Sequence, residues 1–168
     1  MTTRTLNWWV LEDNNEDFEL LDSACRRSDG RIEIERFRSG DDLLARSKDS
    51  VPDLLYLDLR LPVTGGMEVL GQLKQNPAYE CIPKLVFSTS ANPNEIRQAY
   101  QLGGTSFHVK RVETKEMIKL LDHTITYWTA DVALPEYSAR NACRSPLTGE
   151  PSDARPTIPK RVPDEHEA

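Results

Sequence analysis

The stretch DLLYLDLRLPVTGG, residues 53–66, sets a carboxylate at the end of an apolar run. The segment Leu54 to Leu57 is typical of a strand buried inside a sheet, and Asp58 follows it directly. Because an unpaired buried carboxylate is costly, we expect Asp58 either to lie at a strand end open to solvent or to have a cation beside it. Taken alone, a solvated strand-end acid is the simpler interpretation.

The chain up to about Trp128 alternates short apolar runs with helical patterns. This alternation is typical of βα units and predicts an α/β fold with a parallel sheet. Glycines at positions 30 and 103 fall where helices are expected to stop. The expected strands are Trp8–Leu11, Ile32–Phe37, Leu54–Leu57, Lys84–Phe87 and Ser106–Val109.

The last expected helix, about Thr114 to Trp128, carries two apolar stripes. One stripe can pack on the sheet, and the other is available to a partner. Prolines punctuate the chain beyond Asp131. We therefore expect a globular domain at 1–130, an extension with a possible dimer contact at 131–144, and a disordered or loosely attached tail at 145–168.

Composition narrows the functional class. The net charge of -6 argues against general nucleic-acid or membrane binding, which favours clustered Lys and Arg. The three cysteines lack CxxC spacing, which indicates neither a disulfide framework nor a zinc site and is typical of a reducing compartment. The N-terminus lacks a signal-peptide pattern. We therefore expect a cytoplasmic protein.

Polar side chains follow four of the expected strands. Glu12 and Asp13 follow the first, Asp58 ends the third, Ser88 follows the fourth and Lys110 follows the fifth. In an open parallel sheet these ends meet at the edge where ligands bind. Grouped carboxylates repel one another unless a cation intervenes, and Mg²⁺ prefers oxygen ligands.

This set of residue types suits phosphoryl transfer. A carboxylate, here Asp58, can attack a phosphorus centre if a metal ion and an ammonium hold the charge on the phosphoryl oxygens. Lys110 supplies the ammonium, and the Ser88 hydroxyl can donate to a phosphoryl oxygen. Glu12 and Asp13 also have a simpler interpretation, because acids commonly cap helices, although Asn14 or Asn15 can fill that role instead.

The ordered motifs VLEDN, LDLRLP, VFSTS and SFHVK, with Gly66 after Asp58, resemble the receiver domain of response regulators over about Leu6 to Trp128. The resemblance implies a flavodoxin-like, doubly wound five-stranded sheet of order 2-1-3-4-5 with flanking helices. It also assigns roles to individual residues. Asp58 is the phosphoacceptor, Ser88 and Phe107 are the switch residues, and Lys110 is the lysine of the receiver site. The Mg²⁺ site is formed by Asp13, Asp58 and the backbone carbonyl of Arg60, with Glu12 acting mainly through water.

A narrower resemblance covers the end of the domain. EDNNED together with TYWTADVALP is similar to stand-alone regulators that serve phytochrome-type histidine kinases. That resemblance implies a homodimer contact through Tyr127, Trp128, Leu134 and Pro135. The two aromatic residues can equally well close the hydrophobic core.

Three positions depart from the usual receiver pattern: Ser88 stands for Thr, Gly65 for Asp, and Arg111 for the Pro that usually follows the lysine. The usual proline forms a cis peptide that aims the lysine. A cis bond before a residue other than proline costs about 3 kcal/mol, so either that cost is met here or the loop differs locally.

The sequence therefore predicts a non-enzymatic, single-domain response regulator that receives a phosphoryl group from a histidine kinase. A pseudo-receiver that binds without phosphotransfer is the alternative. A phosphohydrolase with an aspartyl nucleophile fits less well, because Arg60 stands where such enzymes carry a second acid. A DNA-binding regulator fits poorly, since no helix-turn-helix pattern follows the receiver.

Overall fold

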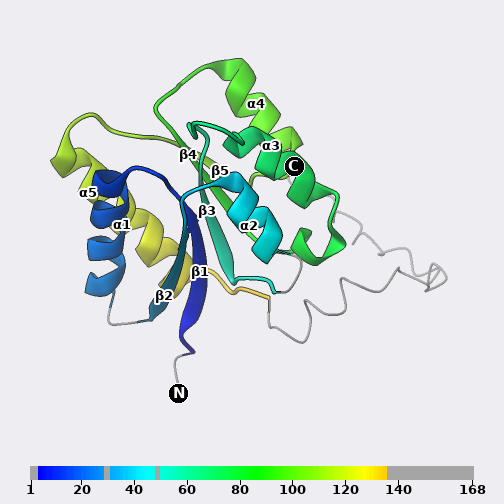
Figure 1. Ribbon diagram of the computed structural model, residues 1–168. Helices are drawn as coiled ribbons and strands as arrows, with labels where there is room; N and C mark the ends of the chain where they lie inside the picture. The colour runs from blue at the N-terminus through cyan, green and yellow to red at the C-terminus, as the bar shows by residue number, and fades with distance from the viewer. Residues whose placement is uncertain (1–3, 29–30, 48–49, 136–168) are drawn as a thin grey trace, which may run out of the picture.

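A five-stranded parallel sheet forms the centre of the computed structural model, which describes residues 4–28, 31–47 and 50–135. The strand order is β2-β1-β3-β4-β5, so the predicted order 2-1-3-4-5 is confirmed (Figure 1). The order reverses direction between β1 and β3, which is where open α/β sheets bind ligands. The strands are β1 (Leu6–Leu11), β2 (Ile32–Phe37), β3 (Leu54–Asp58), β4 (Lys84–Ser88) and β5 (Ser106–Val109).

Helices alternate with the strands, and several of them begin at a residue whose side chain caps the helix. Asn14 Oδ1 accepts a hydrogen bond from the Asp17 backbone N–H (3.1 Å), and Asn92 caps the fourth helix in the same way. Gly103, with φ of 92°, ends that fourth helix in a left-handed conformation that glycine adopts readily. The helices are α1 (Asn15–Arg27), α2 (Gly40–Arg46), α3 (Gly66–Lys74), η1 (Pro77–Tyr79), α4 (Pro93–Gln101), α5 (Thr114–Thr126) and the π-helical turn η2 (Tyr127–Asp131).

The helices form a layer on each face of the sheet. Figure 1 shows α1 and α5 on one side and α2, α3 and α4 on the other. Two separate apolar clusters result, one with Leu21 and Leu121 under α1 and α5, the other with Leu43 and Leu70 under α2 and α3. Because β3 is covered on both faces, all of its residues are buried, which explains the unbroken apolar run before Asp58.

The end of the domain differs from the prediction of one continuous helix to Trp128. The α-helix ends at Thr126 and is followed by η2, in which Thr129 Oγ1 donates to the Ile125 carbonyl (2.7 Å). Trp128 is 8% exposed and packs in the core. The described chain stops at Pro135, so most of the predicted extension and all of the predicted tail at 145–168 lie outside the described residues.

Within the described ranges, none of the helices has the length and apolar character needed to cross a membrane.

A buried lysine lies at the amino-terminal edge of the sheet. Lys84, at the start of β4, donates from Nζ to the carbonyl oxygens of Tyr79 (2.6 Å) and Ile82 (2.9 Å). Burial lowers its pKa from 10.5 to about 8, although Cys81 and Glu80 act in the opposite direction. The lysine holds η1 against the sheet while carrying a charge that the folded state disfavours.

We expect Lys84 to make stability rise with pH above about 8. Between about 8 and 10.5 the unfolded chain binds more protons at this position than the folded chain, so the free energy of unfolding increases with pH. Denaturant unfolding measures the free energy of unfolding of the wild type and of Lys84→Met from pH 8 to 10. Over this range the free energy of the wild type should rise relative to that of Lys84→Met by roughly 1 kcal/mol per pH unit. A difference that stays constant over this range contradicts the account.

Candidate functional site

A lysine ammonium lies among three carboxylates at the carboxyl edge of the sheet. Lys110, which follows β5, donates from Nζ to Glu12 Oε2, Asp17 Oδ2 and Asp58 Oδ2, each at 2.7 Å. Glu12 is fully buried, Asp58 is 4% exposed, and the Lys110 side chain is 7% exposed. The carboxylate at the end of β3 therefore has a cation beside it, which is the second of the two arrangements expected from sequence.

The two carboxylates nearest the strand ends are also held by local backbone groups. The Arg60 N–H donates to Asp58 Oδ1 at 2.8 Å, which leaves Oδ2 facing the ammonium. The Asn14 N–H donates to Glu12 Oε1 at 3.1 Å in the same manner. Each carboxylate thus has one oxygen fixed by its own loop and the other in contact with Lys110.

The loop after Asp58 requires glycine where α3 begins. A Cβ atom added at Gly66 would lie 2.3 Å from the Asp58 carbonyl oxygen and 2.8 Å from the Leu59 Cα. Only a residue without a side chain allows the first turn of α3 to approach the backbone of the phosphoacceptor candidate this closely. The predicted importance of Gly66 thus has a steric cause.

The protonation states follow from burial and from the mutual contacts. Burial raises the pKa of Glu12 to about 7, although the hydrogen bond from Lys110 acts in the opposite direction. Burial alone would lower the pKa of Lys110, but its hydrogen bonds to Asp17, Asp58 and Glu12 outweigh burial and raise the pKa above the usual value. The ammonium is therefore charged at neutral pH, and three acids surround one cation.

The same three acids fit a divalent metal ion. One carboxylate oxygen from each of Glu12, Asp17 and Asp58 lies within 4.8 Å of the others. Hard cations such as Mg²⁺ prefer carboxylate oxygens and retain several waters, and the excess of negative charge over Lys110 favours a divalent ion. Glu12 and Asp58 are thus two predicted site residues that the fold brings together with Lys110.

The other two predicted metal contacts lie differently. Asp13 is half-buried and outside the group of three acids, and its backbone carbonyl accepts a hydrogen bond from Arg36 at 3.1 Å. The Arg60 guanidinium turns toward Glu95, with Nη2 at 3.0 and 3.2 Å from the two carboxylate oxygens. The roles predicted for Asp13 and for the Arg60 carbonyl in metal binding stay predictions.

Asp17 is the site residue that sequence reasoning missed. It lies in the first turn of α1, where an acid is fully explained by the positive end of the helix dipole. A signal was nonetheless present, because the helix begins at the same sheet edge as the strand ends. An acid in its first turn can therefore lie within reach of a lysine that follows another strand of the same sheet.

The two predicted switch residues, Ser88 and Phe107, lie on the neighbouring strands β4 and β5. Ser88 is fully buried, and its Oγ accepts a hydrogen bond from the Ser90 N–H at 3.1 Å. Phe107 is half-buried and packs against the cluster under α2 and α3.

The described chain contains no cis peptide bond, so the Lys110–Arg111 bond is trans. The loop therefore differs locally from the usual arrangement, yet Lys110 still reaches Asp58.

The fold and this acidic pocket define a receiver. Residues 9–122 match the family model described as the response regulator receiver domain. The chain belongs to this family, and the resemblance predicted from the motifs is confirmed.

Individual relatives agree with this assignment. The response regulator Rcp1 of Synechocystis sp. is 29% identical over 133 residues, which cover 75% of this chain and 90% of the relative. The crystal structure of the phosphorylated cyanobacterial phytochrome response regulator RcpA superposes with a TM-score of 0.74 at 29% identity, covering 79% of this chain and 99% of that chain. The crystal structure of the Mn²⁺-bound form of Rcp1 superposes with a TM-score of 0.74 at 28% identity, covering 78% of this chain and 99% of that chain. The predicted resemblance to regulators associated with phytochromes is therefore also confirmed.

We expect Asp17→Asn to weaken divalent metal binding about fivefold, because it removes one negative charge at the partly exposed rim of the pocket, worth about 1 kcal/mol. Glu16→Gln is the matched control, since Glu16 is exposed in the same helical turn. Calorimetric titration with MgCl₂ measures both affinities. Equal affinities for the two variants would show that Asp17 takes no part in the site.

Proposed function

We propose that this chain is a single-domain response regulator that accepts a phosphoryl group on Asp58 from a histidine kinase. The contact between Asp58 Oδ2 and Lys110 Nζ at 2.7 Å, inside a largely buried acidic pocket, carries the proposal. A nucleophile for phosphoryl transfer requires a positive group that holds the phosphoryl oxygens, and Lys110 meets that requirement.

The transfer follows from the arrangement of these side chains. One Asp58 carboxylate oxygen forms a bond to phosphorus while the bond from phosphorus to the donor histidine nitrogen breaks, and the nitrogen keeps the electron pair. Lys110 redirects one N–H from Asp58 to an incoming phosphoryl oxygen. The Ser88 hydroxyl, whose oxygen accepts from the Ser90 N–H, donates its hydrogen to another. When bound, Mg²⁺ would be held by Asp58 and its neighbouring acids and would neutralise charge on the phosphoryl oxygens.

The output of this switch is a change in protein contacts. Ser88 ends β4 and Phe107 lies on the neighbouring strand β5, so inward movement of the serine makes room for inward movement of the aromatic ring. Phosphorylation then biases an existing equilibrium between two conformations, and the surface around α4, β5 and α5 changes.

A phytochrome-type histidine kinase is the proposed phosphodonor. The support is the likeness to Rcp1 and to RcpA, the second of which is a cyanobacterial phytochrome response regulator. We place this exchange in the cytoplasm.

A signalling role fits the site better than the two alternatives. A phosphohydrolase of the aspartyl type uses a second acid two residues after the nucleophile, and here Arg60 occupies that position and pairs with Glu95. A pseudo-receiver has no need of a buried ammonium in contact with Asp58, which this pocket retains.

Intact-protein mass spectrometry tests phosphorylation directly. After incubation with Mg²⁺ and acetyl phosphate, we expect one phosphoryl adduct on the wild type, because Asp58 is the nucleophile and the metal ion neutralises charge. Asp58→Asn and a chelator-treated sample should give none. An adduct that persists in Asp58→Asn would assign the acceptor to another residue, and no adduct on folded, metal-bound wild type would favour the pseudo-receiver.

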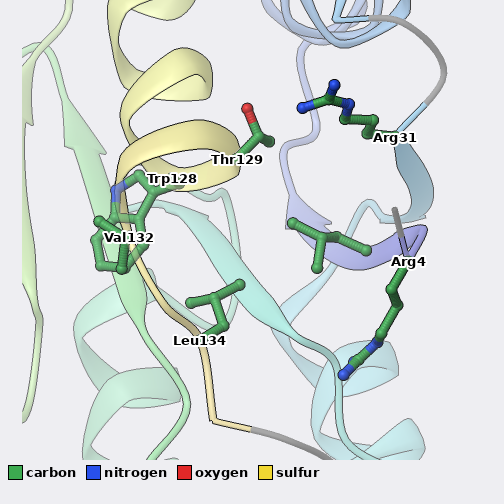
Figure 2. A pocket seen from close by; sticks show the side chains of 7 residues that line it. Arg4, Arg31, Trp128, Thr129, Val132 and Leu134 are labelled. Atoms are coloured by element: carbon green, nitrogen blue, oxygen red, sulfur yellow. The ribbon is translucent and has the colours of Figure 1, made fainter. Parts of the chain in front are cut away.

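We also propose that the end of the domain forms a homodimer contact. Tyr127 is 54% exposed, whereas Trp128 and Leu134 pack inward. A cavity of about 180 Å³ lies beside the helix end. Trp128, Val132 and Leu134 line one side of it, and Arg4 and Arg31 line the other (Figure 2). Tyr127 lines a different hollow of about 380 Å³, together with Leu120 and His123. Burial of this exposed tyrosine against a second copy would cover that hollow.

We expect light scattering of the wild type at high protein concentration to give the mass of a dimer and Tyr127→Glu to give that of a monomer, because a charge at a buried contact is costly. Tyr100→Glu, at a similarly exposed tyrosine on α4, serves as the control and should remain dimeric. A monomeric wild type, or dissociation by Tyr100→Glu alone, would contradict a contact through Tyr127.

A further inference from the structure

Arg36, on the edge strand β2, makes an unusually dense set of contacts with the loop between β1 and α1. Its guanidinium donates to three successive backbone carbonyls of that loop and to the side chain of the first residue of α1. The acceptors and distances are the carbonyl oxygens of Glu12 (3.0 Å), Asp13 (3.1 Å) and Asn14 (3.1 Å) and Asn15 Oδ1 (3.1 Å).

The arginine is itself held in place. Its guanidinium carbon lies 4.1 Å from the centroid of the Phe18 ring, on the first turns of α1. The planar fork of arginine fixes several acceptors in one geometry, which a lysine cannot do with its single ammonium. Strand β2 therefore acts as a rigid support to which the acidic loop is tied.

The tie bears directly on the metal pocket. Glu12 contributes its carboxylate to the group of three acids, and its backbone carbonyl accepts from Arg36 Nε. Asn14, whose carbonyl also accepts from Arg36, donates its N–H to Glu12 Oε1 and caps the helix that carries Asp17. Movement of the loop would thus displace two of the three acids at once.

We propose that Arg36 is a positioning residue for the divalent-metal pocket: it acts through the loop of residues 12–15, without touching the metal ion, and it raises metal affinity by keeping the acids in place. This inference rests on the proposed function only in taking the acidic pocket as the metal site. Sequence reasoning missed it, because the alternation places Arg36 on the same strand face as Ile32 and Ile34 and does not show which loop carbonyls the arginine binds.

Charge and positioning predict effects of opposite sign. Arg36 is a cation near an acidic pocket, so by charge alone its removal would strengthen metal binding. By positioning, its removal weakens binding. Arg36→Lys keeps the charge and loses the fork, whereas Arg36→Met loses both, and Arg38→Met removes a charge from an exposed residue just beyond the same strand.

The test is calorimetric titration of each full-length variant with MnCl₂ and with MgCl₂, well below its measured unfolding temperature. We expect Arg36→Lys and Arg36→Met to bind about tenfold more weakly than the wild type, and Arg38→Met to bind equally or more tightly. Asn15→Ala, which removes one contact from the loop side, should show a smaller loss in the same direction. It serves as the informative variant if the Arg36 variants do not fold.

A second measurement separates positioning from a merely structural role. With acetyl phosphate, the Arg36 variants should need more Mg²⁺ for half-maximal phosphorylation but approach the wild-type rate at saturating Mg²⁺. Unchanged or tighter metal binding in folded Arg36→Lys or Asn15→Ala overturns the proposal, even if the unfolding temperature falls. A wild type that binds metal and takes no phosphoryl group would refute the proposed function, while the metal titrations still decide the role of Arg36.

Discussion

The ion pair between Lys110 and the three acids is the interaction on which the site depends. Without the ammonium, no cation would compensate the ionised forms of Glu12, Asp17 and Asp58, which are grouped at a sheet edge with two of them nearly inaccessible to water. Removal of one partner from a buried ionic group typically costs 3–5 kcal/mol, because the remaining charges lose their compensation. If a metal ion or a phosphoryl group binds as proposed, it brings new charge into the same small volume, and Lys110 would then exchange partners. The contacts of Lys110 in this pocket would therefore depend on the charge bound there.

The fold positions these groups with elements that do not touch the ligand. Parallel strand ends bring the acids and the lysine to one edge, Gly66 lets α3 begin against the Asp58 backbone, and Arg36 ties the loop after β1 to the neighbouring strand. Under the proposed function, support of this kind keeps the acids and Lys110 in place while phosphorylation shifts the equilibrium between the two conformations.

Much of this organisation was predictable because it follows from periodicity and strand-end chemistry. Apolar runs located all five strands, and the order of the acids, the hydroxyl and the lysine identified the receiver. Other features were not predictable for physical reasons. The first-turn acid Asp17 is equally explained by the helix dipole, and the sequence does not show which backbone carbonyls the strand arginine Arg36 binds, so only the three-dimensional contacts reveal these roles. Trp128 could face either way on a helix with two apolar stripes, and packing turned it inward.

The most direct test of the central claim is a crystal structure with Mg²⁺ and beryllofluoride, a mimic of the phosphoryl group. The account predicts that beryllium bonds to an Asp58 carboxylate oxygen and that Lys110 Nζ moves from at least one of its present acids to a fluoride. Retention of all three carboxylate contacts by Lys110, with beryllofluoride absent from Asp58, would contradict the account.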